Sequence, residues 1–251
     1  MTATGLKVYL LDVEGTVAPL SLVTGQLFPY ARKHFDSFLR ENITQDSVHR
    51  DLMMLKLERT QEQDPDAPSF DPPASRTDPG VVSMSPAKGV PLVLRYIFWL
   101  MDRDRKSTAL KSLQGKIWRA GFEQGELKGT LFADVPAAFE RWAKVGKVAI
   151  YSSGSVEAQQ LLFRHSTYGD LTPLISGYFD TRIGPKSESA SYAAIAARFA
   201  VAPANMLFFS DVVRELDAAR AAGCATRLVV REGNAPVDPH GHASTPTLTG
   251  I

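Results

Sequence analysis

The sequence predicts an α/β fold, a doubly wound parallel sheet into which a helical domain is inserted. In the second half of the chain, short apolar runs alternate with helical patterns. This alternation is typical of parallel strands joined by right-handed crossover helices. About 130 residues separate the first apolar run from the second, which is far more than one crossover helix needs. A chain of 251 residues has room for one large domain or two smaller ones.

The predicted strands are short, almost wholly apolar and bounded by Asp, Ser or Gly, as expected of strands that are covered on both faces. They are Leu6–Leu11, Lys147–Ser152, Met206–Ser210 and Thr226–Val230. Helical periodicity follows in Ser155–Phe163 and Glu188–Ala200. We therefore predict an α/β core domain built from residues 1–20 and 131–251.

Residues 21–130 are predicted to form a separate helical domain, since they show helical periodicity and no comparable strand signal. The helical stretches are Phe28–Asn42, Val93–Asp104 and Ser107–Phe122, the last with Ser107 as its N-cap. Between them, the segment Gln61–Pro91 holds seven of the 16 prolines. This segment is predicted to be an irregular excursion.

Composition excludes several classes of protein. The 28 basic and 27 acidic residues leave a net charge of +1, which gives no electrostatic reason to expect nucleic acid or a membrane as the partner. The only cysteine, Cys224, cannot form an internal disulfide, and the sequence does not begin with a secretory signal pattern. The longest apolar stretch, Val90–Met101, is too short to span a membrane and contains Arg95. We expect a cytoplasmic protein that acts on a small molecule.

Polar residues collect where the predicted strands end, which in an open α/β sheet is where ligands bind. Each has an ordinary structural explanation alone, because acids and serines often cap turns and helices after strands. Their occurrence together at one sheet edge favours a functional site. Hydroxyls, free N–H groups and a lysine suit a phosphate, and the acids suit a cation or an acid–base role. The set is Asp12, Glu14, Ser152, Ser153, Gly154, Lys186 and Asp211.

These positions resemble the four motifs of the haloacid dehalogenase superfamily, here "DVEGT" from Asp12, "SSG" from Ser152, Lys186, and "SDVVRE" from Ser210. Longer stretches resemble one branch of it, the enolase-phosphatases of methionine salvage. They include "LLDVEGTVAPLSLVTGQLFPY", "STALKSLQGKIWRAGF", "FDTRIGPKSESASY" and "VVREGNAP". The resemblance extends from about Leu10 to Pro236 and implies a monomeric enzyme.

The resemblance implies a role for each matching residue. Asp12 would attack phosphorus and form an aspartyl phosphate that water hydrolyses. Mg²⁺ would be held by the carboxylates of Asp12 and Asp211 and the backbone carbonyl of Glu14. The phosphoryl group would be bound by Ser152, Ser153, Gly154 and Lys186.

Glu14 distinguishes this chain within the superfamily. The phosphatases carry an acid two places after the nucleophile, usually Asp, whereas the dehalogenases generally lack it and the ATPases carry Thr. Glu at this position is typical of the enolase-phosphatase branch, whose substrate is 2,3-diketo-5-methylthiopentyl 1-phosphate. The substrate is enolised and then dephosphorylated to an acireductone. Glu14 is the first candidate for the enolising base, and Lys186 would have to be neutral to serve.

Two alternatives remain open at this point. A general phosphatase of small metabolites would use the same motifs, and a protein that only binds would retain the fold without catalysis, although intact motifs argue against it. The inserted helical domain is expected to cover the substrate. Its Trp118 and Phe122 would then contact the methylthio tail, although a place in the domain core is the more ordinary role for each. His165 is expected to have a structural or capping role, and Arg231 and Asn234 are assigned no chemistry.

Overall fold

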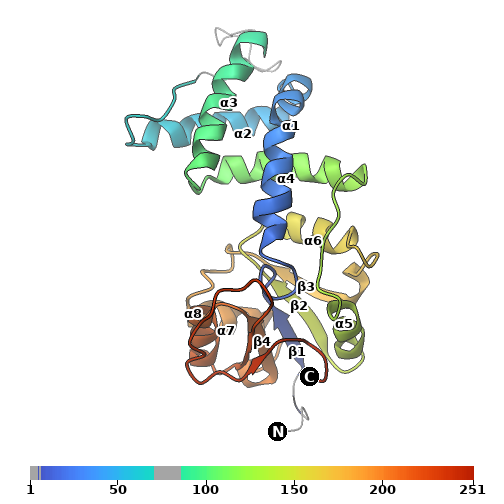
Figure 1. The fold of residues 1–251 in the computed structure, drawn as a ribbon. Coiled ribbons are helices and arrows are strands. Elements are labelled where there is room, and N and C mark those ends of the chain that lie inside the picture. Colours follow the sequence, from blue (N-terminus) through green and yellow to red (C-terminus); the bar gives the residue numbers. More distant parts are fainter. Residues whose placement is uncertain (1–4, 6, 71–85) are drawn as a thin grey trace. The chain divides into compact units, whose positions relative to one another are not determined.

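The computed structural model describes residues 5, 7–70 and 86–251 (Figure 1). The chain divides into two compact units, one made of Met1–Gln26 with Phe122–Ile251 and the other of Leu27–Gly121. The sequence placed the corresponding boundaries at 20/21 and 130/131. Each unit has its own hydrophobic core and is described separately.

The first unit contains a six-stranded parallel sheet in the order β3-β2-β1-β4-β5-β6. Its strands are β1 (Val8–Leu11), β2 (Lys147–Tyr151), β3 (Ile175–Phe179), β4 (Met206–Ser210), β5 (Ala225–Val229) and β6 (Ser244–Thr245). The predicted fold class is confirmed, and the four predicted strands are present with ends shifted by at most two residues. Two strands were not predicted: β3, which has Gly177 at its centre and lies half-buried at the sheet edge, and the two-residue β6.

Helices cover both faces of this sheet (Figure 1). The first unit contains α5 (Val135–Ala143), α6 (Val156–Arg164), α7 (Ser189–Arg198), α8 (Val213–Ala221) and the short turns η2 (Thr172–Leu174) and η3 (Pro203–Asn205). Alternate residues of β1 point to opposite faces. Val8 and Leu10 join a core cluster with α7 and α8, whereas Tyr9 stacks on Trp142 of α5 at 4.7 Å.

The second unit is built from α1 (Phe28–Asn42), α2 (Asp46–Gln61), α3 (Pro86–Asp102) and α4 (Thr108–Glu123), with η1 (Leu22–Leu27) leading into it. Phe35, Leu52, Ile97 and Leu113, one from each helix, have no exposed surface. The predicted helices correspond to α1, the later part of α3, and α4. Helix α2 was not predicted, because its buried residues are spaced among many charged ones. Within the described residues, none of the helices has the length and hydropathy needed to cross a membrane.

The proline-rich segment Gln61–Pro91 differs from its prediction at both ends. Gln61 is the last residue of α2, and α3 already begins at Pro86 and includes Pro91. The prediction of irregular structure is therefore wrong for 86–91, where packing of Val90 into the core outweighs the proline signal. For residues 71–85 the prediction lies outside the described part of the chain.

Candidate active site

The site begins where β1 ends. Asp12 is buried, and its N–H donates to the carbonyl of Phe209 on β4 at 2.9 Å. The chain then turns sharply, since the N–H groups of residues 16–18 all donate to the carbonyl of Val13 at 2.9–3.2 Å. Gly15 adopts a φ of +74°, a left-handed conformation that favours glycine. The turn thus carries Asp12 and Glu14 at the carboxyl edge of the sheet.

Asp211 approaches this turn from the neighbouring strand. It directly follows β4, which pairs with β1, and a Cβ atom built on Gly15 would lie 2.2 Å from its Oδ2 atom. Its Oδ1 atom is buried and has no hydrogen-bond partner. Gly15 is therefore required for close approach as well as for its φ, and Asp211 keeps an unsatisfied oxygen beside the turn.

Lys186 joins two of the acids. Its Nζ atom pairs with Asp12 Oδ1 and lies 2.6 Å from Glu215 Oε2, and the hydroxyl of Ser210 donates to the same oxygen at 2.9 Å. Burial lowers the pKa of Lys186, but the charges and hydrogen bonds of Asp12 and Glu215 outweigh this effect and raise its pKa above the usual value. The lysine is therefore protonated. Its carbonyl accepts a hydrogen bond from Tyr192 of α7 at 2.7 Å.

Negative charge exceeds positive charge in this cluster. Burial, followed by the charge of Asp12, raises the pKa of Glu14 to about 7 and that of Asp211 to about 7. The pKa of Glu215 is raised by the same two causes in the same order. In the metal-free protein the pKa of Glu14 thus lies near neutral pH, the range that suits a group that both accepts and donates a proton.

The serine loop follows β2. The register pairs Leu11 with Ile150, so this loop leaves the sheet at the edge where Asp12 does. Ser152 is buried and its Oγ accepts from the Gly154 N–H at 3.1 Å, while Ser153 is exposed. Ser155 caps α6 by accepting from the Ala158 N–H at 3.2 Å. The first turn of α6 is thus fixed beside an exposed serine.

The acids at this edge have a donor set that fits a hard cation. Two carboxylates and a backbone carbonyl suit an ion that keeps several waters, as Mg²⁺ does. The buried Oδ1 atom of Asp211 is an acceptor without a partner, and after burial the charge of Asp12 is the next largest cause of the raised pKa of Glu14. Within the described ranges, we find no group of three or more His, Cys, Asp or Glu side chains that could hold a metal ion without other ligands. A cation here would therefore depend on waters or substrate oxygens as well.

The structure brings together Asp12, Glu14, Lys186 and Asp211, and it adds three residues to which the sequence assigned no role. Glu215 holds Lys186, Arg231 donates to the carbonyl of Thr16, and Asn234 donates to that of Gly15. The signal for Glu215 was its place one helical turn after Asp211. Arg231 and Asn234 had only their position after a strand.

Three other side chains singled out in the sequence have structural contacts. Trp118 donates its indole N–H to the carbonyl of Leu27 at 2.8 Å. Phe122 is buried and stacks on His165 with ring centroids 5.7 Å apart. His165 is the C-cap of α6, which confirms its predicted capping role.

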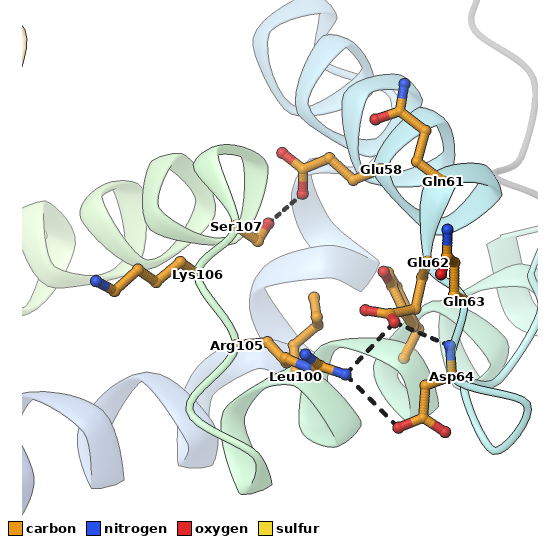
Figure 2. Close-up of a pocket in the computed structure, with 10 residues that line it drawn as sticks. Glu58, Gln61, Glu62, Gln63, Asp64, Leu100, Arg105, Lys106 and Ser107 are labelled. Carbon is orange, nitrogen blue, oxygen red and sulfur yellow. Dashed lines mark hydrogen bonds and ion pairs between the residues drawn. The ribbon is translucent and has the colours of Figure 1, made fainter.

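The helical unit contains a cavity of about 820 Å³ that the sequence did not predict (Figure 2). Figure 2 shows Arg105 between Glu62 and Asp64, with Nη2 at 3.4 and 3.6 Å from their carboxylate oxygens. Glu58 accepts hydrogen bonds from the Ser107 hydroxyl and the Ala109 N–H at the start of α4. These charged groups are engaged in holding the unit together.

Comparisons with known proteins give matches over most of the chain. The profile of the haloacid dehalogenase-like hydrolases matches residues 6–223. The chain is 51% identical over 230 residues to enolase-phosphatase E1 of Synechococcus elongatus, covering 91% of this chain and 90% of that protein. It is 40% identical over 247 residues to enolase-phosphatase E1 of Pseudomonas fluorescens, covering 98% and 97%. The crystal structure of the UTR4 protein of Saccharomyces cerevisiae aligns with a TM-score of 0.73 at 32% identity, covering 98% of this chain and all of that one.

Proposed function

The chain belongs to the enolase-phosphatase E1 family of the haloacid dehalogenase-like hydrolases, and from this premise we propose the reaction that it catalyses. The substrate is 2,3-diketo-5-methylthiopentyl 1-phosphate, and the products are phosphate and the acireductone 1,2-dihydroxy-5-methylthiopent-1-en-3-one. The observation that carries the proposal is the grouping of Asp12, Glu14 and Asp211 around Gly15, with Lys186 on the nucleophile. We further propose that the chain is a monomer in the cytoplasm and that its only partner is the small phosphorylated substrate.

The cofactor is Mg²⁺, in keeping with the general metal dependence of phosphatases in this superfamily. Its ligands from the protein are the carboxylates of Asp12 and Asp211 and the backbone carbonyl of Glu14. When bound, the cation supplies positive charge that polarises carbonyl and phosphoryl oxygens. The buried, unpartnered oxygen of Asp211 supports this assignment.

Enolisation needs a base that removes a proton from C1 of the substrate. We assign this role to Glu14, because a pKa of about 7 leaves a substantial ionised fraction at neutral pH. Lys186 is protonated and cannot accept the proton. As the C1–H bond breaks, its electron pair forms the C1=C2 double bond, and the C2 oxygen takes up a proton from water.

Dephosphorylation follows on the same turn. Asp12 attacks phosphorus, the bond between phosphorus and the C1 oxygen breaks, and protonated Glu14 gives its proton to that leaving oxygen. Lys186 orients Asp12 through Oδ1, and with the Ser152–Gly154 loop it offsets phosphoryl charge. Water then attacks the phosphorus of the aspartyl phosphate and loses a proton to Glu14, which is ionised again. The bond between phosphorus and the Asp12 oxygen breaks, so phosphate and the Asp12 carboxylate are released, and Glu14 returns the proton to solvent.

The test compares two kinds of substrate with purified protein and Mg²⁺. The diketone phosphate should first yield the enol, which is detected by its absorbance, and then release phosphate. Simple phosphate esters should be hydrolysed far more slowly, and Asp12→Asn should release no phosphate from either. Efficient hydrolysis of simple esters without enol formation would instead identify a general small-metabolite phosphatase.

A further inference from the structure

The segment after β5 contacts the turn that carries Asp12 and Glu14. We propose that Arg231 and Asn234 are positioning residues, which hold this turn against Asp211 and so set the geometry of the reacting groups. The proposal rests on the function proposed above and extends it to two side chains that take no part in the chemistry themselves.

The two side chains bind consecutive carbonyls of the turn. Asn234 Nδ2 donates to the Gly15 carbonyl at 2.9 Å, and Arg231 Nε donates to the Thr16 carbonyl at 3.0 Å. The hydrogen bonds that close the turn itself use other acceptors, chiefly the carbonyl of Val13. The carbonyls of Gly15 and Thr16 thus connect the turn to the rest of the unit.

Arg231 is a rigid anchor for this contact. It is 7% exposed, and its Nη1 atom donates to Asp134 Oδ2 at 2.9 Å and to the Pro246 carbonyl at 3.0 Å. Its guanidinium lies 4.3 Å from the ring centroid of Phe132. Asp134 Oδ2 also accepts from the Leu248 N–H at 2.6 Å. A planar guanidinium held from several directions has little freedom to move, so the Thr16 carbonyl is fixed.

The position of Gly15 determines how close Asp211 can come, since only hydrogen occupies the space that a Cβ would fill 2.2 Å from Oδ2. A turn released from Asn234 would shift relative to this carboxylate and carry the Glu14 carbonyl with it. The serine loop and Lys186 lie on other segments and would stay in place. Loss of positioning should therefore lower kcat and cation affinity more than it raises KM.

The test uses two variants and a matched control. Asn234→Ala removes the donor, and Asn234→Asp keeps the shape but directs a carboxylate oxygen at the Gly15 carbonyl. The control is Asn205→Asp, because Asn205 makes the same kind of bond, at 3.0 Å, to the carbonyl of Gly5 just before β1 begins. The control measures the cost of losing an amide–carbonyl contact away from the site.

Three quantities are measured: kcat and KM on the diketone phosphate, Mg²⁺ binding without substrate by calorimetry, and Tm. Both Asn234 variants should lose about tenfold to 100-fold in kcat, with KM changed less than about twofold and Mg²⁺ binding weakened about tenfold. Asn205→Asp should keep the wild-type kcat and Mg²⁺ affinity. A carboxylate added near the site would by charge alone tighten cation binding, so weaker binding in Asn234→Asp indicates a displaced turn.

Wild-type kcat and Mg²⁺ affinity in both Asn234 variants would overturn the positioning role. So would equal losses in Asn205→Asp, since they would reflect stability alone. If the wild-type protein were inactive on the diketone phosphate, the proposed substrate would fail. The variants would then still be compared by their Mg²⁺ binding and by their hydrolysis of p-nitrophenyl phosphate. A wild-type protein that neither binds Mg²⁺ nor hydrolyses this ester would overturn the proposed function itself.

Discussion

Replacing Gly15 by alanine should remove activity far beyond its effect on stability. Two costs arise at this position. Alanine at a φ of +74° is strained, which costs about 1–2 kcal/mol of unfolding free energy. Its Cβ would also lie 2.2 Å from Asp211 Oδ2, whereas ordinary contact begins at 3.4 Å, so the carboxylate must retreat by about 1.2 Å. A displacement of this size in a group that positions the reacting atoms costs about 100-fold in rate.

Gly125 provides the matched control. It has a φ of +76° in the same unit, and a Cβ built on it meets nothing within 4 Å. Gly125→Ala should therefore show the backbone strain without the clash. Urea unfolding and steady-state kinetics on the diketone phosphate, measured for both variants, separate the two costs.

We expect Gly15→Ala to lose at least as much unfolding free energy as Gly125→Ala, because it adds the clash to the same backbone strain, and we expect a loss of at least about 100-fold in kcat only in Gly15→Ala. Gly15→Ala with wild-type kcat would refute the argument that the turn and Asp211 share one tightly packed site. Equal losses of kcat in both variants would attribute the effect to backbone strain instead.

Three further predictions concern charge, capping and the thiol. The folded-state pKa values of Glu14 and Asp211, about 7, lie above their ordinary values of 4.5 and 3.8. The folded state therefore binds more protons than the unfolded state, and the metal-free protein should lose stability as pH rises toward 7. Mg²⁺ should restore this stability. Calorimetry checks this by measuring Tm between pH 4.5 and 7, once with a chelator and once with Mg²⁺. A Tm of the metal-free protein that stays constant over this range would contradict the prediction. Ser155→Ala should cost about 1 kcal/mol in urea unfolding, because the α6 N-cap bond to the Ala158 N–H is lost; no change would mean that water replaces the cap. Burial raises the pKa of Cys224 to about 11, so a thiol reagent at neutral pH should modify it slowly in the native protein and rapidly in denaturant, and fast native labelling would show local opening.

The strands that the sequence predicted are those whose pattern is local. Buried central strands such as β1 and β4 are continuous apolar runs, and period and length suffice to recognise them. The edge strand β3 is half-buried and interrupted by Gly177, so its sequence resembles that of a loop. Helix α2 has few buried residues, and they are spaced among charged ones. Its sequence therefore lacks the apolar periodicity that would have predicted a helix packed in the helical unit.

The candidate site divides in the same way. Asp12 and Asp211 could be placed in advance, because parallel strands bring their carboxyl ends to one edge. The bond between Asn234 and Gly15 joins residues 219 positions apart, and the anchor of Arg231 depends on Asp134. No local pattern encodes such contacts, since they arise only when the loops after separate strands fold against each other.

The charge balance of the site explains why these supports are needed. Asp12 and Glu215 share the protonated Lys186, and the side chains of all three are at most 16% exposed. Glu14 and Asp211 add carboxyl groups whose pKa values are raised by burial and by Asp12. Like charges gathered in a poorly solvated place repel one another, which opposes the close approach of the turn to Asp211. The tethers from Arg231 and Asn234 resist this repulsion, and a bound cation would remove its cause. Burial, the largest cause of the raised pKa of Glu14, does not depend on the cation and continues to favour the protonated form when the charge of Asp12 is offset.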